Sequence, residues 1–309
     1  MKVLITPRSF GKHDDTPFAL LRGKGIEPVS NSTGGIMPEH ELKAAISGAA
    51  GVIIGVDPLT ADVMSAAPQL RAVAKYGVGT DNIDLDYCES KGIKVSRTVG
   101  ANSDAVADYT FALMLALARK IVAIDAGCRR RDWGKITTSD VSGRTLGLIG
   151  LGAIGRGVVQ RAQGFGMKVM AYDLYWDKGY AERSGIEKAE IDDIVRCADF
   201  ISLHVPLTDA TKHLMDSRRI GMMKQGAYIV NTARGGLIDE AALLTALESG
   251  SIGGAGIDVF AEEPPHDDRW YGLGNVVLGS HCAASTEGAS ANMSMMATRN
   301  LLRDLGLLE

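Results

Sequence analysis

The sequence predicts an α/β fold with two domains, each built on a parallel sheet. Short Val/Ile/Leu-rich runs alternate with helix-like segments along almost the whole chain, as expected of α/β proteins. The runs are continuously apolar, which is typical of parallel strands covered on both faces. The alternation forms two series, separated by one long, mostly apolar helix predicted at residues 104–120. We therefore expect two Rossmann-like domains with a cleft between them.

The first series fills the first third of the chain. The predicted strands are residues 3–5, 51–56, 72–74 and 93–95, and the predicted helices are residues 16–24, 38–47 and 60–66. A last helix, residues 286–303, follows the second series and has room to pack back on this first domain. We therefore expect a discontinuous, flavodoxin-like substrate-binding domain made of residues 1–100 plus 286–309.

The second series is longer and clearer. Its predicted helices are residues 153–165, 191–197, 217–223 and 239–249, and its predicted strands are residues 145–149, 168–172, 200–204, 227–231, 254–259 and 275–278. Six strands with intervening helices is the count of a full dinucleotide-binding domain. We expect this NAD-binding Rossmann domain to span residues 101–285.

Composition excludes several classes of protein. The 309 residues carry a net charge of -4, and a nucleic-acid partner would favour a basic surface instead. The basic run Arg129–Arg131 is followed at once by Asp132, so it is interpreted as a solvated or interface face. The longest apolar stretch, residues 111–118, is far shorter than the roughly 20 residues that cross a bilayer.

The cysteines and the first residues of the chain indicate a compartment. Four cysteines are scattered without a Cys-x-x-Cys pair, which argues against a zinc site or a disulfide scaffold and suits a reducing environment. The first residues lack the long apolar core of a signal peptide. We expect a cytoplasmic protein without a metal.

A glycine loop follows the first strand of the second series. It reads Gly150-x-Gly152-x-x-Gly155, between a predicted strand and a predicted helix. Gly150 permits the tight turn, Gly152 admits a pyrophosphate close to the backbone, and Gly155 lets helix and strand pack closely. The helix N-terminus offers free N–H groups to the phosphates. The alternative is a glycine-rich turn without a ligand.

An acid ends the next predicted strand, at Asp173. In dinucleotide-binding domains such a carboxylate accepts hydrogen bonds from the ribose hydroxyls, and it repels a 2′-phosphate. The next residues, Leu174, Tyr175 and Trp176, supply no cation. The sequence therefore favours NAD over NADP.

Three ionisable residues follow later strands of the same series. These are Arg234, Glu263 and His281, and in an open parallel sheet ligands bind at the carboxyl ends of the strands. An arginine at such a site binds a carboxylate in bidentate fashion. A histidine exchanges a proton near neutral pH, and an acid beside it fixes the tautomer and stabilises imidazolium.

Other interpretations remain open for these residues. Arg234 could be a surface ion-pair residue, and His281 could be a structural histidine. The adjacent Glu262 could replace Glu263 as its partner. Cys282 is interpreted as a small buried filler and not as a nucleophile.

At these residues the chain resembles the D-isomer-specific 2-hydroxyacid dehydrogenases, in particular their phosphoglycerate dehydrogenase-like branch. The matching segments occur in family order over nearly the whole chain: residues 75–84, 147–155 with Asp173, 204–208, 231–236, 258–265 and 281–286.

The resemblance implies an NAD-dependent oxidoreductase that transfers a hydride between nicotinamide and a D-2-hydroxy acid or 2-keto acid. The substrate would be 3-phosphoglycerate or a related small acid such as hydroxypyruvate or glyoxylate. Arg234 would hold the substrate carboxylate and polarise its 2-oxygen, and His281, oriented by Glu263, would move the hydroxyl proton.

The resemblance also implies two sets of binding residues and a homodimer. The dimer would use the helix at residues 104–120 and the arm beyond it. The substrate would contact Tyr76, Val78, Gly79 and Arg234. Beyond the three glycines and Asp173, residues expected at the cofactor are Ala153, Ile154, His204, Val205, Pro206, Thr232, Ala233, Asp258 at the nicotinamide end, and Ala284. His204 is assigned no proton chemistry.

Three departures from the family pattern bear on the substrate. Many phosphoglycerate enzymes carry an arginine where this chain has Gly55 and Val56, and Asp57 adds a negative charge there. Arg8 could substitute as a phosphate ligand from another direction. Ser280 replaces the family's proline before the histidine, which changes the backbone and not the chemistry. The chain ends soon after its last helix, so we expect no feedback control through an appended regulatory domain.

Two other functions compete with the dehydrogenase hypothesis. A nicotinamide-sensing corepressor would keep the fold as a protein-binding scaffold, but it would not need the arginine, acid and histidine together. A methyltransferase with a similar glycine loop would not need them either.

Overall fold

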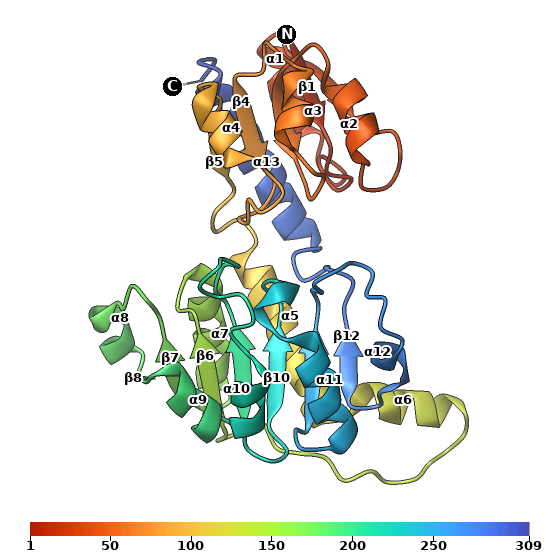
Figure 1. Ribbon diagram of the computed structural model, residues 1–309, viewed down its shortest axis with the longest axis vertical. Coiled ribbons are helices and arrows are strands. Elements are labelled where there is room, and N and C mark those ends of the chain that lie inside the picture. The colour runs from red at the N-terminus through yellow and green to blue at the C-terminus, as the bar shows by residue number, and fades with distance from the viewer. Residues whose placement is uncertain (309) are drawn as a thin grey trace. The chain divides into compact units, whose positions relative to one another are not determined.

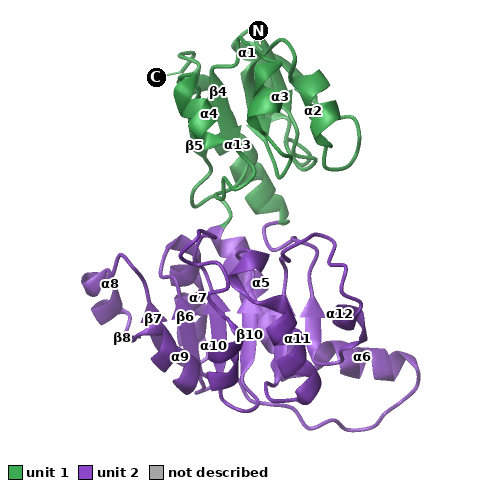
Figure 2. Cartoon of the chain, in the orientation of Figure 1, with its two compact units in different colours: residues 1–102, 285–309 green, residues 103–284 purple. Residues whose placement is uncertain are grey.

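Figure 1 shows the computed structural model of the chain, in which residues 1–308 are described. The chain divides into two compact units, shown in different colours in Figure 2. The first holds Met1–Asn102 and the segment from Ser285 onward, and the second holds Ser103–Ala284. Each unit is built on one parallel sheet, so the predicted α/β class is confirmed.

The first unit has a five-stranded sheet in the order β2-β1-β3-β4-β5. All neighbouring pairs are parallel, and the order is that of flavodoxin-like folds. The strands are β1 (Lys2–Ile5), β2 (Glu27–Ser30), β3 (Ala49–Ile54), β4 (Ala72–Lys75) and β5 (Lys94–Arg97). Strand β2 was not predicted, because this edge strand is partly exposed and contains a proline.

Helices cover both faces of this sheet. They are α1 (Thr16–Gly23), α2 (Glu39–Ile46), α3 (Ala61–Ser65), α4 (Leu85–Ser90) and α13 (Glu287–Asp304). Residues of α2, α3 and α4 form the core on one face, and residues of α1 and α13 form the core on the other. Leu301 of α13 packs directly against Gly51 of β3. The last helix of the chain therefore completes the unit that the first residues begin.

The second unit has a seven-stranded sheet in the order β12-β11-β10-β9-β6-β7-β8. All pairs are again parallel. The strands are β6 (Thr145–Ile149), β7 (Lys168–Tyr172), β8 (Ile186–Lys188), β9 (Phe200–Leu203), β10 (Tyr228–Asn231), β11 (Gly254–Ile257) and β12 (Val276–Leu278). The strand order reverses at β6, which lies between β7 and β9. Ligands of doubly wound sheets bind at the carboxyl ends of the strands at such a point.

The helices of the second unit form a layer on each face of its sheet (Figure 1). Helices α5 (Ser103–Ala118), α7 (Ala153–Gly164) and α8 (Lys178–Arg183) pack on one face. The other face carries α9 (Ile191–Cys197), α10 (Ser217–Met222), α11 (Glu240–Ser249) and α12 (Arg269–Gly272). A 3-10 turn, η1 (Gly235–Leu237), follows β10.

The long helix predicted at residues 104–120 is shorter in the structure. Helix α5 ends at Ala118, and Lys120 adopts a left-handed backbone with φ of 48°. A separate helix, α6 (Ile121–Arg129), begins immediately afterwards. Eight residues of α5 are buried, so this helix is part of the core of its own unit.

Two structural findings bear on the predicted class of protein. No helix within residues 1–308 is long and apolar enough to cross a membrane. Across the same residues, no group of three histidine, cysteine or acidic side chains is placed to hold a metal ion.

Candidate active site

The residues singled out in the second series lie at one edge of the seven-stranded sheet. Gly150 follows β6, Asp173 follows β7, His204 follows β9, and Arg234 lies three residues beyond the end of β10. Asp258 follows β11, and His281 lies three residues beyond β12. Because every strand of the sheet is parallel, these residues all lie at its carboxyl edge, where α/β sheets bind ligands.

The glycine loop has the shape that a dinucleotide needs. Gly150 has a φ of 105°, and a Cβ there would lie 2.4 Å from the His204 carbonyl oxygen. A Cβ on Gly155 would lie 2.3 Å from the Gly150 carbonyl oxygen, so helix α7 packs closely on the loop. Gly152 has open space where its Cβ would be, and Ala153 beside it is exposed. The first turn of α7 is therefore open to a phosphate group.

Asp173 is held beside this loop. Its Oδ2 accepts the Leu151 N–H at 2.6 Å, and its Oδ1 accepts the Tyr175 N–H at 2.7 Å. A carboxylate has about four acceptor positions, so both oxygens keep capacity for ribose hydroxyls. The glycine loop, the helix start and the acid fit an NAD-type dinucleotide.

His281 and Glu263 are in contact. Nδ1 of His281 lies 2.9 Å from Oε2 of Glu263, while Oε1 of Glu263 accepts the Phe260 N–H at 3.1 Å. The His281 side chain is 38% exposed and that of Glu263 is 37% exposed. With Nδ1 turned to the carboxylate, Nε2 of His281 is the nitrogen left for a substrate.

The environment of Glu263 keeps its carboxylate ionised. Burial raises the pKa of Glu263, but the hydrogen bonds from His281 and the Phe260 N–H and the charge of Arg234 outweigh burial. The net pKa is below the ordinary value for a glutamate. Glu262 instead pairs with His266, 2.9 Å away, so Glu263 is the acid in contact with His281.

A close backbone contact brings the loop of Arg234 next to the loop that carries Glu263. A Cβ on Gly235 would lie 1.9 Å from the Phe260 carbonyl carbon, so the loop after β10 lies directly on the loop that carries Glu263. Asn231 fixes the turn, because its Nδ2 donates to the Arg234 carbonyl oxygen at 2.8 Å. The guanidinium itself donates from Nη1 to the Ala233 carbonyl oxygen at 2.6 Å.

Asp258 holds the loop that carries His281. It is fully buried, and its two carboxylate oxygens accept the N–H groups of Cys282 at 3.0 Å and Ala283 at 2.9 Å. Its carbonyl oxygen accepts the His281 N–H at 2.8 Å. His281 has a left-handed φ of 56°, which is uncommon for a residue other than glycine.

Tyr109 and Cys282 complete this support. The Cys282 thiol lies 3.2 Å from the Tyr109 hydroxyl, and a Cβ on Gly279 would clash with both that hydroxyl and the Asp258 carboxylate. Burial first, then the contact with Cys282, raises the pKa of Tyr109 well above its ordinary range. Tyr109 and Gly279 were not singled out from the sequence, because their role depends on contacts distant along the chain.

The His204 ring is uncharged at neutral pH. Burial lowers the pKa of its ring to about 4. Its Nε2 lies 2.8 Å from the Ser202 hydroxyl, and its Nδ1 is buried without a hydrogen-bond partner among the described residues. This environment agrees with assigning it no proton chemistry.

The remaining residues expected at the cofactor lie around the same edge of the sheet. Thr232 is buried and its hydroxyl lies 3.1 Å from that of Thr110. The Ala233 N–H is bound by the Asn231 side chain, and Val205 packs beside Gly150. Ile154, Pro206 and Ala284 are at least partly accessible to solvent.

The residues expected at the substrate, apart from Arg234, belong to the first unit. Tyr76, Val78 and Gly79 follow β4. The Tyr76 hydroxyl donates to the Ser290 carbonyl oxygen at 3.0 Å, so it is engaged by α13. The loop is closed at its base by Lys75, whose Nζ donates to Asn82 Oδ1 at 2.7 Å. Val78 at its tip is exposed.

Asp57, expected to add negative charge beside Gly55 and Val56, is a buried residue, with only 3% of its surface exposed. Its carboxylate accepts the Thr6 hydroxyl and, at 2.8 Å, the Met37 N–H. Arg8 is exposed and donates to the Gly34 carbonyl oxygen at 3.1 Å.

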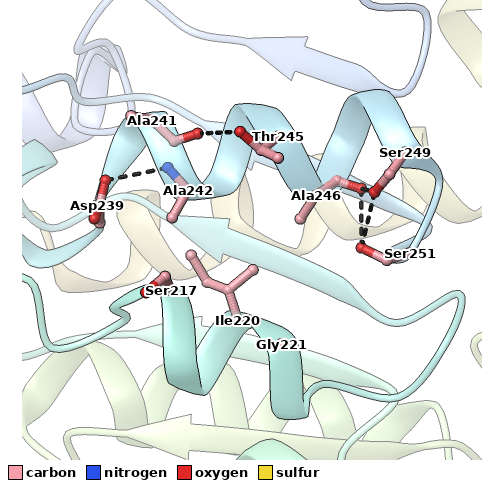
Figure 3. Close-up of a pocket in the computed structure, with 10 residues that line it drawn as sticks. All are labelled: Ser217, Ile220, Gly221, Asp239, Ala241, Ala242, Thr245, Ala246, Ser249 and Ser251. Carbon is pink, nitrogen blue, oxygen red and sulfur yellow. Dashed lines mark hydrogen bonds between the residues drawn. The ribbon is translucent and has the colours of Figure 1, made fainter.

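The second unit also has a surface hollow of about 460 Å³ (Figure 3). It is formed between α10 and α11 and is lined mainly by small side chains. Its only ionisable lining residue, Asp239, caps α11 through the Ala242 N–H at 3.1 Å. It contains none of the residues predicted for binding or catalysis.

Comparison with known proteins decides the family. Residues 111–283 match the model of the D-isomer specific 2-hydroxyacid dehydrogenase NAD-binding domain. This chain belongs to the D-isomer specific 2-hydroxyacid dehydrogenase family. It is accordingly an NAD-dependent oxidoreductase acting on a 2-hydroxy acid or 2-keto acid, and the methyltransferase hypothesis is wrong.

Similar proteins of this dehydrogenase family are reductases and dehydrogenases. A glyoxylate reductase of Korarchaeum cryptofilum is 42% identical over 80% of this chain and 76% of its own length. A hydroxypyruvate reductase of Thermotoga maritima is 40% identical over 83% of this chain and 84% of its own. A D-3-phosphoglycerate dehydrogenase of Methanocaldococcus jannaschii is 46% identical over 75% of this chain, but the match covers 45% of that protein. The corepressor alternative is not supported.

Solved structures of the same dehydrogenase fold include cofactor complexes. The TT0316 protein of Thermus thermophilus has a TM-score of 0.91 and 36% identity, covering 100% of this chain and 98% of its own. A D-lactate dehydrogenase of Aquifex aeolicus, complexed with NAD and lactic acid, has a TM-score of 0.84 and 30% identity over 99% and 96% of the chains. An acyclic imino acid reductase (Bsp5), in complex with NADPH and D-Arg, has a TM-score of 0.88 and 27% identity over 99% and 97%.

Proposed function

We propose that this dehydrogenase reduces a small, unphosphorylated 2-keto acid of the glyoxylate or hydroxypyruvate type and oxidises the matching D-2-hydroxy acid. The contact between His281 and Glu263, with Arg234 on the adjoining loop, carries the proposal. These residues supply a proton donor, its orienting acid and a carboxylate-binding cation at one edge of one sheet.

The proposed mechanism assigns one task to each residue. Arg234 binds the substrate carboxylate and polarises the 2-oxygen. His281 gives a proton from Nε2 to that oxygen during reduction and accepts it during oxidation. Glu263 holds Nδ1 of His281 and stabilises the imidazolium. The nicotinamide supplies or accepts the hydride when the cofactor is bound. Asp258 fixes the His281 loop in addition to its expected place near the nicotinamide.

A small substrate without phosphate is favoured by two observations. Relatives that are 42% and 40% identical and align over most of both chains are named glyoxylate reductase and hydroxypyruvate reductase. The position where many phosphoglycerate enzymes carry an arginine is Gly55–Val56 here. The backbone around Val78 and Gly79 is proposed to contact the substrate carboxylate.

The test is a screen of NADH oxidation with glyoxylate, hydroxypyruvate, 3-phosphohydroxypyruvate, pyruvate and bulkier keto acids. The highest kcat/KM is expected with glyoxylate or hydroxypyruvate, and a preference for the phosphorylated acid would overturn the proposed substrate class. His281→Ala and Arg234→Ala should each lower turnover at least about a hundredfold. Near-normal rates in either variant would remove that residue from the mechanism.

A homodimer built on α6 and the arm that follows it is also part of the proposal. Exposed apolar side chains are concentrated there: Ile121, Val122, Ile124, Trp133 and Ile136. Trp133 is 79% exposed. Exposed apolar side chains concentrated in one segment are typical of an association site. Helix α5 contributes mainly to its own core, so α6 and the arm are the better candidates for the interface. A cytoplasmic location stays a prediction.

A further inference from the structure

The residues directly after Asp173 include no cation. The fold, however, places one, Arg156, at the proposed ribose end of the cofactor site. Arg156 lies on the first turns of α7, and its Nε donates to the Leu151 carbonyl oxygen at 3.2 Å. The N–H of the same Leu151 donates to Asp173 Oδ2 at 2.6 Å. The guanidinium and the ribose-binding acid are thus linked through a single residue of the glycine loop.

The Arg156 guanidinium forms an ion pair with another acid, Asp177. Nη2 of Arg156 donates to Asp177 Oδ2 at 2.9 Å, and the Arg156 guanidinium carbon lies 4.3 Å from the centre of the Tyr180 ring. Asp177 also caps α8, because its Oδ1 accepts the Tyr180 N–H at 2.9 Å. That N–H bond first, then the bond from Arg156, lowers the pKa of Asp177. The carboxylate is therefore ionised at neutral pH.

Both side chains remain accessible to a ligand. Arg156 is 41% exposed and Asp177 is 42% exposed. Arginine recognises phosphate through its planar set of N–H donors, and a guanidinium near the ribose is how dinucleotide folds accommodate a 2′-phosphate. In this chain two of those donors are occupied, Nε by the Leu151 carbonyl oxygen and Nη2 by Asp177, and the charge is neutralised by Asp177.

We propose that Asp177 is a specificity-determining residue, which disfavours NADP by engaging Arg156 and adding a negative charge beside Asp173. This inference rests on the proposed role of Asp173 at the ribose. Cofactor choice does vary within this fold, since the imino acid reductase named above holds NADPH. Asp173 repels a 2′-phosphate directly. Asp177 neutralises the charge of Arg156, which would otherwise offset that repulsion.

The test compares the dissociation constants of NADH and NADPH, measured by nucleotide fluorescence without substrate at one low ionic strength. Asp177→Asn removes the charge and keeps the helix cap, because Asn and Asp cap helices equally well. NADPH should bind about fivefold more tightly to this variant, the scale of an accessible ion pair. NADH binding should change by less than about twofold, because it has no 2′-phosphate.

Two further variants separate this mechanism from a general charge effect. Arg156→Gln in the Asp177→Asn background should abolish the gain in NADPH binding. Asp192→Asn removes the same charge from Arg218 and Arg219, elsewhere in this unit, and should leave the ratio of the two constants unchanged. The inference is overturned if Asp177→Asn leaves the ratio unchanged, if the gain survives in the double variant, or if Asp192→Asn reproduces it. A wild-type chain that binds no NADH would instead overturn the cofactor site itself.

Discussion

The backbone of Gly235 packs directly against the backbone of Phe260: a Cβ on Gly235 would lie 1.9 Å from the Phe260 carbonyl carbon. The backbone of Gly235 does not have a positive φ, so the glycine is needed for space. The contact joins the loop of Arg234 to the loop of Glu263. Arg234, proposed to bind the substrate carboxylate, and Glu263, which contacts His281, are therefore positioned by one backbone contact.

Gly235→Ala should separate these two loops. We expect kcat/KM to fall at least about tenfold, because a misplacement of about an ångström is costly in catalysis. The free energy of unfolding should fall by about 1–3 kcal/mol from overpacking. Steady-state kinetics and urea denaturation measure the two effects. Gly274→Ala is the control, since nothing lies within 4 Å of a Cβ there, and equal losses in the two variants would contradict the spatial argument.

Asp258→Asn tests whether this acid supports the His281 loop. An amide has only one acceptor atom, so one of the N–H groups of Cys282 and Ala283 loses its partner. We expect kcat to fall at least about tenfold and stability to fall by about 1–3 kcal/mol. The dissociation constant of NADH should change by less than about threefold, because the loop and not the cofactor is disturbed. Weaker NADH binding with an unchanged kcat would show that contact with nicotinamide is the main role of Asp258.

His204 should make the protein sensitive to acid. The pKa of its ring is about 4 in the folded chain, against 6.5 for the free group. Between these values the unfolded chain binds the additional proton, so stability is lost as the pH falls from 6.5 toward 4. We expect wild type to lose up to about 3 kcal/mol over this range relative to His204→Gln. Urea denaturation across this pH range measures the difference, and parallel curves for the two proteins would contradict it.

Val122→Glu tests the proposed dimer interface. Val122 lies on α6 and is 58% exposed, so a charge there should not disturb the fold of one subunit. If Val122 is buried in the dimer interface, the new carboxylate should raise the dimer dissociation constant at least about tenfold, because an unpaired charge is costly to desolvate. Sedimentation velocity over a dilution series measures this. Leu174→Glu, which also places a charge at an exposed leucine, is the control, and a wild-type monomer would remove the proposed dimer.

Much of the second unit was predictable because its signals are local. The turn at Gly150, the acid at Asp173 and the apolar strands before Arg234 and His281 are each encoded by neighbouring residues. Strands β2 and β8 were missed for the opposite reason. Both are short strands at a sheet edge with exposed side chains, so they lack the apolar run that marks a buried strand.

Other features depend on contacts between segments distant in sequence. Asp57 is buried because Thr6 and Met37, both at least 20 residues away in sequence, hydrogen-bond to its carboxylate. Arg156 lies on α7 and meets Asp177 only in the fold, so the residues that follow Asp173 in sequence do not reveal this cation. Tyr109 supports a loop more than 150 residues later in the chain. A side chain's neighbours across a fold cannot be read from its neighbours in sequence.

The discontinuous first unit has a consequence for synthesis on the ribosome. Domains that are continuous in sequence can fold in the order in which they emerge. Here the apolar face of β1, β3 and β4 is covered by Ala297, Leu301 and Leu302 of α13, which are translated after the whole of the second unit. The N-terminal strands therefore emerge first and are completed last. Until α13 is released from the exit tunnel, that face has the cover of α1 but lacks the apolar side chains of α13.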